Sequence, residues 1–153
     1  MIAQASLAAL IALALWGAYS DIRFRRLSNV LCLVTLIAGL GFGYALHDLQ
    51  WVGMSLLHAL AALLIGMLLF QSGIVGGGDA KYFAALSAWI PIKLIFTQIM
   101  LVSLAGIAVV LVSFTYRRLT GKQMAGMHNK DKAHTIPYGV AIAAGALLTR
   151  LTM

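Results

Sequence analysis

The stretch from residue 2 to residue 20 carries no charged side chain. An apolar helix of about 20 residues is long enough to cross the roughly 30 Å hydrocarbon core of a bilayer. Inside that core the backbone must satisfy its own hydrogen bonds, so a spanning segment is either a helix or part of a closed barrel. The stretch therefore predicts a transmembrane helix.

The rest of the chain has the same apolar character. Hydrophobic residues make up 62% of the 153 residues and charged residues 10%, whereas soluble domains are near a quarter charged. No Lys or Arg precedes the first apolar stretch, so it lacks the basic start of a signal peptide and is expected to be retained. The length suits one membrane-embedded domain over residues 1–153, with no separate soluble domain.

Polar and helix-breaking residues divide the chain into six apolar segments, which predicts an all-α, polytopic membrane protein of about six transmembrane helices. The expected helices are residues 2–20, 30–46, 53–70, 79–90, 93–116 and 136–150. The fourth is short, and Pro91 breaks the chain after it. The longest polar stretch, residues 117–135, separates the last two helices.

The basic residues predict how these helices are oriented, because basic loops stay on the cytoplasmic side of a membrane protein. With the N-terminus outside, only Lys93 and Arg150 of the eleven Lys and Arg residues fall on the outer side. Both termini are therefore expected outside. The net charge of +7 has the same explanation, and no nucleic-acid partner is expected, because no basic patch alternates with aromatic residues.

The chain has few residues that bind metals. Its single cysteine, Cys32, lies in an apolar run and can form neither an internal disulfide nor a zinc site. The four histidines (His47, His58, His128 and His134) have no metal-ligand spacing, and His58 is expected to be a hydrogen-bonded helix residue. The sequence therefore predicts no metal site.

Acidic residues are scarcer still, since the chain has four aspartates and no glutamate. Asp48 lies in a short outer turn and Asp131 lies between two lysines, so both are expected to be solvated loop charges. Asp21 and Asp79 each lie where a predicted membrane helix meets the inner interface. Ionisable residues at such positions are costly and usually functional.

The two interfacial aspartates are expected to differ in proton affinity. Asp21 follows the C-terminal end of the first helix, where the helix dipole disfavours the anion and nearby arginines offset this in part. Asp79 lies near a helix N-terminus, where free N–H groups favour the anion. If the two lie close together, they would share one proton, as the catalytic pair of an aspartic protease does. One carboxylate then activates water and the other protonates the scissile carbonyl.

Each aspartate also has a purely structural interpretation. Asp79 alone would make a good N-cap, and Asp21 could pair with a neighbouring arginine. The glycine run in IVGGGDAKYF, residues 74–83, favours a function, because a cap requires no glycines before it. Glycine allows unusual backbone angles and the close approach of another backbone, which suits a loop against which an extended peptide lies.

Three segments together resemble the type IV prepilin peptidases, membrane aspartic peptidases with a GxGD motif. They are Asp21-Ile22-Arg23 with Arg26 and Asn29, then GGGDAK at residues 76–81, then IPYGVAIAAGAL at residues 136–147. The order, the spacing and the six-helix layout cover essentially the whole chain.

The resemblance implies a membrane endopeptidase that removes the leader from prepilins or pseudopilins at the cytoplasmic face of the bacterial inner membrane. Asp21 and Asp79 would be the catalytic pair, Gly76 and Gly78 would shape the loop, and no cofactor would be needed. Enzyme and leader would both be basic, so anionic lipid of the inner leaflet would gather them.

Further candidate site residues are less specific. Lys81 could adjust the proton affinity of Asp79 or hold a substrate carboxylate, and it could equally anchor a helix end at the interface. Asn29 matches the asparagine that follows the first aspartate in the family. Pro137 and Tyr138 either place a turn near the site or begin the last helix.

Two departures from the family pattern narrow the prediction. Leu27 and Ser28 stand where many relatives have Ile-Pro before the asparagine, so this loop is expected to be less rigid. The loop is also short and lacks cysteine, whereas longer relatives that also methylate the new pilin N-terminus have a large loop there, often with two CxxC zinc motifs. The chain is therefore expected to be a peptidase without methyltransferase activity, similar to those of tight-adherence (Flp-type) pilus systems.

Three other interpretations remain open. A small proton-coupled transporter would have both carboxylates near the bilayer midplane, whereas the hydropathy pattern places them at the interface. A non-enzymatic membrane assembly subunit would tolerate asparagine at both positions. A presenilin-like protease would carry a Tyr-Asp pair, but Ser20 separates Tyr19 from Asp21.

Overall fold

The computed structural model describes residues 1–119 and 138–153 of the chain. Within these ranges all regular structure is helical, which confirms the predicted fold class. The elements are α1 (Ile2–Phe24), α2 (Asn29–Leu46), α3 (Leu49–Gln71), α4 (Gly77–Ser87), the short 3-10 helix η1 (Ile92–Leu94), α5 (Ile95–Leu119) and α6 (Tyr138–Leu151).

Four segments of the described chain are long and apolar enough to cross a bilayer. They are α1, α2, α3 and Ile92–Tyr116, which comprises η1 and most of α5. α6 is apolar but has 14 residues. α4 has 11 residues, so at 1.5 Å per residue it covers about 16 Å, roughly half of the hydrocarbon core. The chain is thus a multi-pass membrane protein in which α4 reaches only part of the way across.

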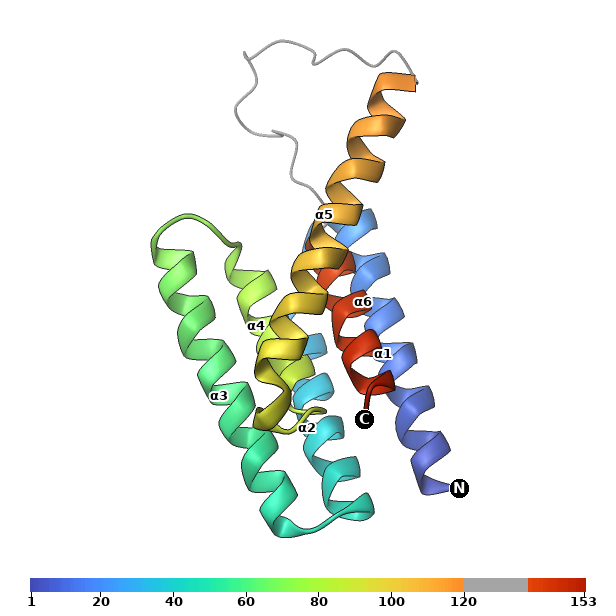
Figure 1. Cartoon of the computed structure of the whole chain (residues 1–153), viewed down its shortest axis with the longest axis vertical. Helices are drawn as coiled ribbons and strands as arrows, with labels where there is room; N and C mark the ends of the chain where they lie inside the picture. The colour runs from blue at the N-terminus through green and yellow to red at the C-terminus, as the bar shows by residue number, and fades with distance from the viewer. Residues whose placement is uncertain (120–137) are drawn as a thin grey trace.

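The helices form one bundle around α4 (Figure 1). α4 packs against α2, α3 and α6, while α6 also packs against α1 and α5. The α1–α2 loop and the α3–α4 connection lie at one end of the bundle, and the N-terminus and the α2–α3 turn lie at the other (Figure 1). Both segments that the sequence singles out, around Asp21 and around Asp79, are therefore at the same end.

Small residues allow several helices to approach closely, as expected for helix packing in lipid. A methyl group added at Gly145 of α6 would lie 2.5 Å from the Cα of Val102 in α5. One added at Gly66 of α3 would lie 2.8 Å from the Cβ of Ala80 in α4. Gly41 of α2 differs from these two glycines, because an added methyl there has nothing within 4 Å.

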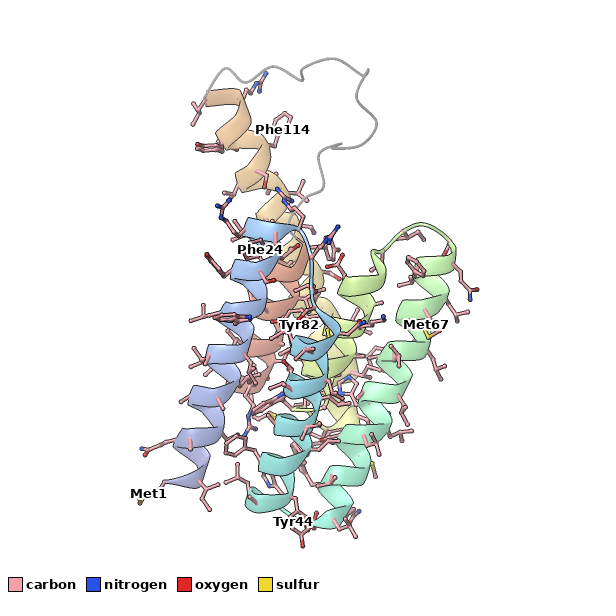
Figure 2. The ribbon with its side chains drawn as sticks, turned by 180° about the vertical axis from the view of Figure 1, so that it is seen from behind. Met1, Phe24, Tyr44, Met67, Tyr82 and Phe114 are labelled. Carbon is pink, nitrogen blue, oxygen red and sulfur yellow. The ribbon has the colours of Figure 1, made fainter. Side chains whose placement is uncertain are left out.

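Tyr82 of α4 fills the interior of the bundle (Figure 2). Its hydroxyl lies 3.3 Å from the carbonyl oxygens of both Leu13 and Ala14 in α1. Gly17, one turn further along α1, leaves room for the ring, because an added methyl would overlap the Tyr82 hydroxyl. Tyr82 therefore joins α4 to the helix that carries Asp21.

Gly17→Ala is expected to destabilise the bundle by about 1–3 kcal/mol, the usual cost of overpacking. The added methyl would collide with the Tyr82 ring, so α1 and α4 would have to separate. Gly53→Ala is the matched control, since a methyl there meets nothing within 4 Å. Thermal unfolding in detergent should show a lower midpoint for Gly17→Ala alone, and equal midpoints for the two variants would contradict this packing.

Hydrogen bonds between side chains and backbone carbonyls join the segment that follows α4 to the neighbouring helices α2 and α3. Nδ1 of His58 in α3 hydrogen-bonds the carbonyl oxygen of Ile90 at 2.9 Å. The indole N–H of Trp89 donates to the carbonyl oxygen of Thr35 in α2, also at 2.9 Å. Such partners are required because no water is present in the bilayer core. The hydrogen-bonded histidine expected at residue 58 is confirmed.

Candidate active site

Asp21 lies in the last turn of α1 and is 8% exposed. The predicted loop over residues 21–29 is wrong at its start, because α1 continues through Asp21 to Phe24, with Ile22 and Phe24 exposed on its surface. The helix ends at Arg25, whose φ of 53° is in the left-handed region and whose N–H donates to the carbonyl oxygen of Asp21. This sharp turn directs the α1–α2 loop across the end of the bundle.

The N-terminus of α6 holds the Asp21 carboxylate. The backbone N–H of Gly139 donates a 2.8 Å hydrogen bond to Oδ2 of Asp21. Gly139 is the second residue of α6, so its N–H is one of the first-turn donors that no helical carbonyl can satisfy. The carboxylate therefore has a fixed position relative to two helices.

Gly139 has no room for a side chain at this contact. An added methyl would lie 2.9 Å from Oδ2, 3.1 Å from Cγ and 3.0 Å from Cβ of Asp21. The predicted site residues ended at Tyr138 and omitted this glycine. The available signal was the Pro-Tyr-Gly sequence itself, since a glycine in the first turn of a helix permits close approach.

Asp79 lies in the first turn of α4, three residues after the N-cap residue Gly76. The backbone N–H of Gly76 donates to the Asp79 carboxylate. This hydrogen bond is one half of a capping box, the half in which the N3 side chain accepts from the N-cap residue. A methyl at Gly76 would lie 2.8 Å from Oδ2 of Asp79. The interpretation of Asp79 as the N-cap is therefore wrong. A side chain at residue 76 would collide with the Asp79 carboxylate, which explains the glycine there.

The glycine run provides space and no unusual backbone angle. Gly76 has φ −69° and ψ 142°, an extended conformation that any residue adopts. In the described chain the one glycine with positive φ is Gly73, at 75°. Gly78 faces the α1–α2 loop, with an added methyl 3.5 Å from Cβ of Leu27. The unusual angles expected at the triple glycine are therefore wrong, while the close approach is present at Gly76.

Asp21 and Asp79 line one open cavity of about 750 Å³. Its size lies within the usual range of about 300–1,000 Å³ for ligand-binding clefts. The predicted site residues that line it are Asp21, Asn29, Gly76, Gly78, Asp79 and Tyr138. Arg25 and Arg26 line it as well. Pro137 lies outside the described residues.

The pKa of Asp79 is raised to about 6. Burial is the largest cause and the charge of Asp21 is the second, while the N–H of Gly76 lowers the pKa in part. The two carboxylates are thus close enough to interact. The helix N-terminus favours the anion, as expected, but burial and the charge of Asp21 outweigh it.

Lys81 does not line this cavity. Its Nζ donates to Oδ1 of Asn29 at 3.1 Å, and it lies beside a separate apolar groove between α2 and α3. The hydrogen bond links α4 to the first residue of α2. This geometry favours an anchoring role for Lys81 over direct contact with Asp79.

Two serines restrain the α1–α2 loop. The hydroxyl of Ser28 accepts the N–H of Leu31 at 3.1 Å and caps α2. The hydroxyl of Ser20 donates to the carbonyl oxygen of Arg26 at 2.8 Å. Hydrogen bonds therefore hold both sides of the loop that borders the cavity.

The arrangement supplies an acid and a base to an open, water-accessible cavity. One carboxyl group keeps its proton at mildly acidic pH, and a second carboxylate lies near it, which is the requirement for general acid–base attack by water. Among the residues that the structure describes, no three His, Cys, Asp or Glu side chains are grouped so as to hold a metal ion.

The model of the type IV leader peptidase family matches residues 8–111, which is well over half of the chain. The chain belongs to the type IV leader peptidase family. The match includes Asp21 and Asp79, and it confirms the resemblance seen in the sequence. The leader peptidase match ends before α6, which contributes Gly139 to the site. No curated protein and no solved structure matched the chain.

Proposed function

We propose that this chain is an aspartic endopeptidase that removes the leader from type IV prepilins or pseudopilins. The observation that carries the proposal is the pair formed by Asp21 and Asp79, which line one cavity and interact electrostatically. Membership of the leader peptidase family supports the class of substrate.

In the proposed mechanism Asp79 carries the shared proton and Asp21 is ionised, because the pKa of Asp79 is raised to about 6. A water molecule between them gives a proton to Asp21 as its oxygen attacks the scissile carbonyl carbon. Asp79 donates its proton to the carbonyl oxygen. When the tetrahedral intermediate collapses, the C–N bond breaks, the proton on Asp21 passes to the leaving amine, and the hydroxyl proton returns to Asp79.

The distribution of basic residues supports a cytoplasmic location for this site in the bacterial inner membrane, with both termini outside. The apolar helix of the precursor would lie in the bilayer and its leader in the cytosol. The peptide bond must unwind before attack, since helical bonds are shielded. Arg25 and Arg26 line the cavity, so anionic lipid, and not direct charge attraction, would gather a basic leader.

The short connection between α1 and α2 supports a peptidase without methyltransferase activity. It comprises residues 25–28, which is too short to fold into a separate cytoplasmic domain. This compact form favours a precursor of the Flp type. Residues 1–153 would then act as a single membrane-embedded domain.

The proposal is tested by co-expressing the chain with a panel of Flp-type and pseudopilin precursors. Loss of the leader is followed by gel mobility, and the mass of the product shows whether its new N-terminus is methylated. We expect a shortened, unmethylated product from at least one Flp-type precursor. If every precursor remains full length while the chain is present in the membrane, the proposal is wrong.

Cleavage is also expected to decline as the pH rises through about 6. The singly protonated pair predominates below the pKa of Asp79, which is about 6, and above it the acid that protonates the carbonyl is lost. In detergent solution kcat/KM should fall about tenfold per pH unit on the alkaline side. A profile that is flat across this range, measured with a precursor that does not titrate there, would contradict the assignment of the proton to Asp79.

A further inference from the structure

A second cavity adjoins the catalytic one. It has a volume of about 200 Å³ and lies between α3, α4, α5 and α6. The two cavities share Val75, Asp79 and Tyr138. Apart from Asp79, Tyr138 and Ser103, its lining is made of apolar side chains and glycine. Asp79 is therefore bordered by an open polar cavity and by a small apolar one.

The apolar cavity reaches exposed side chains of α3 and α5. These helices lie on either side of α4 and, over the described residues, do not pack along one another (Figure 1). Ile65 of α3 and Ile99 of α5 line the cavity and are 47% and 41% exposed. Ala80 and Phe83 of α4 also line the cavity. The cavity therefore extends from Asp79 to the exposed sides of two apolar helices.

We infer that this cavity binds the apolar side chain of the substrate residue that directly follows the scissile bond. The inference rests on the proposed peptidase function. With the scissile carbonyl at Asp79, the leader would extend into the open cavity, and the membrane-embedded part would extend toward α3 and α5. The first residue of that part meets the apolar lining.

The size of the cavity determines what it accepts. Its volume of about 200 Å³ is below the lower end of about 300 Å³ for clefts that hold drug-sized ligands. It therefore has room for one large apolar side chain and none for a helix. In an apolar pocket, one methylene more or less changes kcat/KM by about 10–200-fold, so the cavity sets specificity at this position.

Ile99→Trp tests the inference, because an indole at residue 99 fills the cavity. Cleavage is measured on precursors that carry Phe, Leu, Ala or Ser directly after the scissile bond. The parent should prefer Phe to Ala by about tenfold or more, and Ile99→Trp should remove that preference. Ile107→Trp is the matched control, since Ile107 is also on α5 and is 58% exposed but does not line the cavity. An unchanged preference in Ile99→Trp overturns the inference.

A second readout does not depend on cleavage. A photo-crosslinking amino acid is placed at residue 99 or at residue 107 in an Asp79→Asn background, in which the intact precursor should accumulate. Residue 99 should capture the precursor at the position after the scissile bond, and residue 107 should capture lipid. Capture of lipid alone at residue 99 shows that an acyl chain occupies the cavity and overturns the inference.

The outcomes separate this inference from the proposed function. If Asp21→Asn and Asp79→Asn abolish cleavage while the substrate preference of Ile99→Trp equals that of the parent, the peptidase stands and the specificity pocket does not. If Asp79→Asn still cleaves, the proposed catalytic pair is wrong, whichever residue the crosslinker captures.

Discussion

Asp21→Asn and Asp79→Asn should each reduce leader cleavage by about 10³–10⁴-fold, because an amide can neither accept the proton of the attacking water nor act as the acid. General acid–base groups typically contribute about 10²–10⁴-fold. Members of a pair that acts as a unit lose almost all of their joint contribution when one is removed. The double variant should therefore have about the same residual activity as either single variant.

Asp48→Asn is the matched control for the two catalytic variants. Asp48 caps α3 at the opposite end of the bundle and accepts the N–H of Trp51 at 2.7 Å. Asparagine is an equally good N-cap, so this variant should fold and cleave like the parent. Membrane levels are measured for all variants by immunoblot. Cleavage that survives in Asp21→Asn or in Asp79→Asn would eliminate the pair.

The second large effect is expected at Gly139, a residue that takes no part in bond making. Gly139→Ala should lower kcat by about 10–100-fold with little change in KM. The added methyl would lie 2.9 Å from Oδ2 of Asp21, so the carboxylate must move away and its hydrogen bond to α6 weakens. A misplacement of about 1 Å can cost a factor of about 100 in rate.

Gly41→Ala controls for the change from glycine to alanine within a helix, because a methyl at Gly41 meets nothing within 4 Å. Both variants are purified, and kcat, KM and the thermal midpoint are measured together. A lower kcat at an unchanged midpoint identifies Gly139 as a positioning residue for Asp21. If Gly139→Ala retains the parent's kcat, the N-terminus of α6 does not position the carboxylate.

Hydropathy predicted the number and order of the helices well, because bilayer thickness sets their length. The second helix, expected over residues 30–46, is observed as Asn29–Leu46. The end of the first helix was misplaced because a charged residue was assumed to terminate the apolar segment. Asp21 stays within α1 because the partner of its carboxylate is Gly139, 118 residues away in sequence. No local pattern around Asp21 contains that information.

The candidate site shows the same division between local and long-range information. The two aspartates could be selected from sequence, since the chain has only four acidic residues and two of them lie in polar stretches of the sequence. The partner of Lys81 could not, because Asn29 belongs to another helix and lies 52 residues away in sequence. A residue two positions after Asp79 is rotated by about 200° around the helix and faces another side. Which helix lies on that side is long-range information.

The unequal lengths of α2 and α5 mean that the protein has no single hydrophobic thickness. α2 has 18 residues and α5 has 25, or about 27 Å and about 38 Å of helix. Phe114 on α5 lies beyond Phe24 at the end of α1 (Figure 2). A flat bilayer matches both lengths only if α5 tilts or the bilayer thins beside α2, and we expect one or both adjustments where this protein lies.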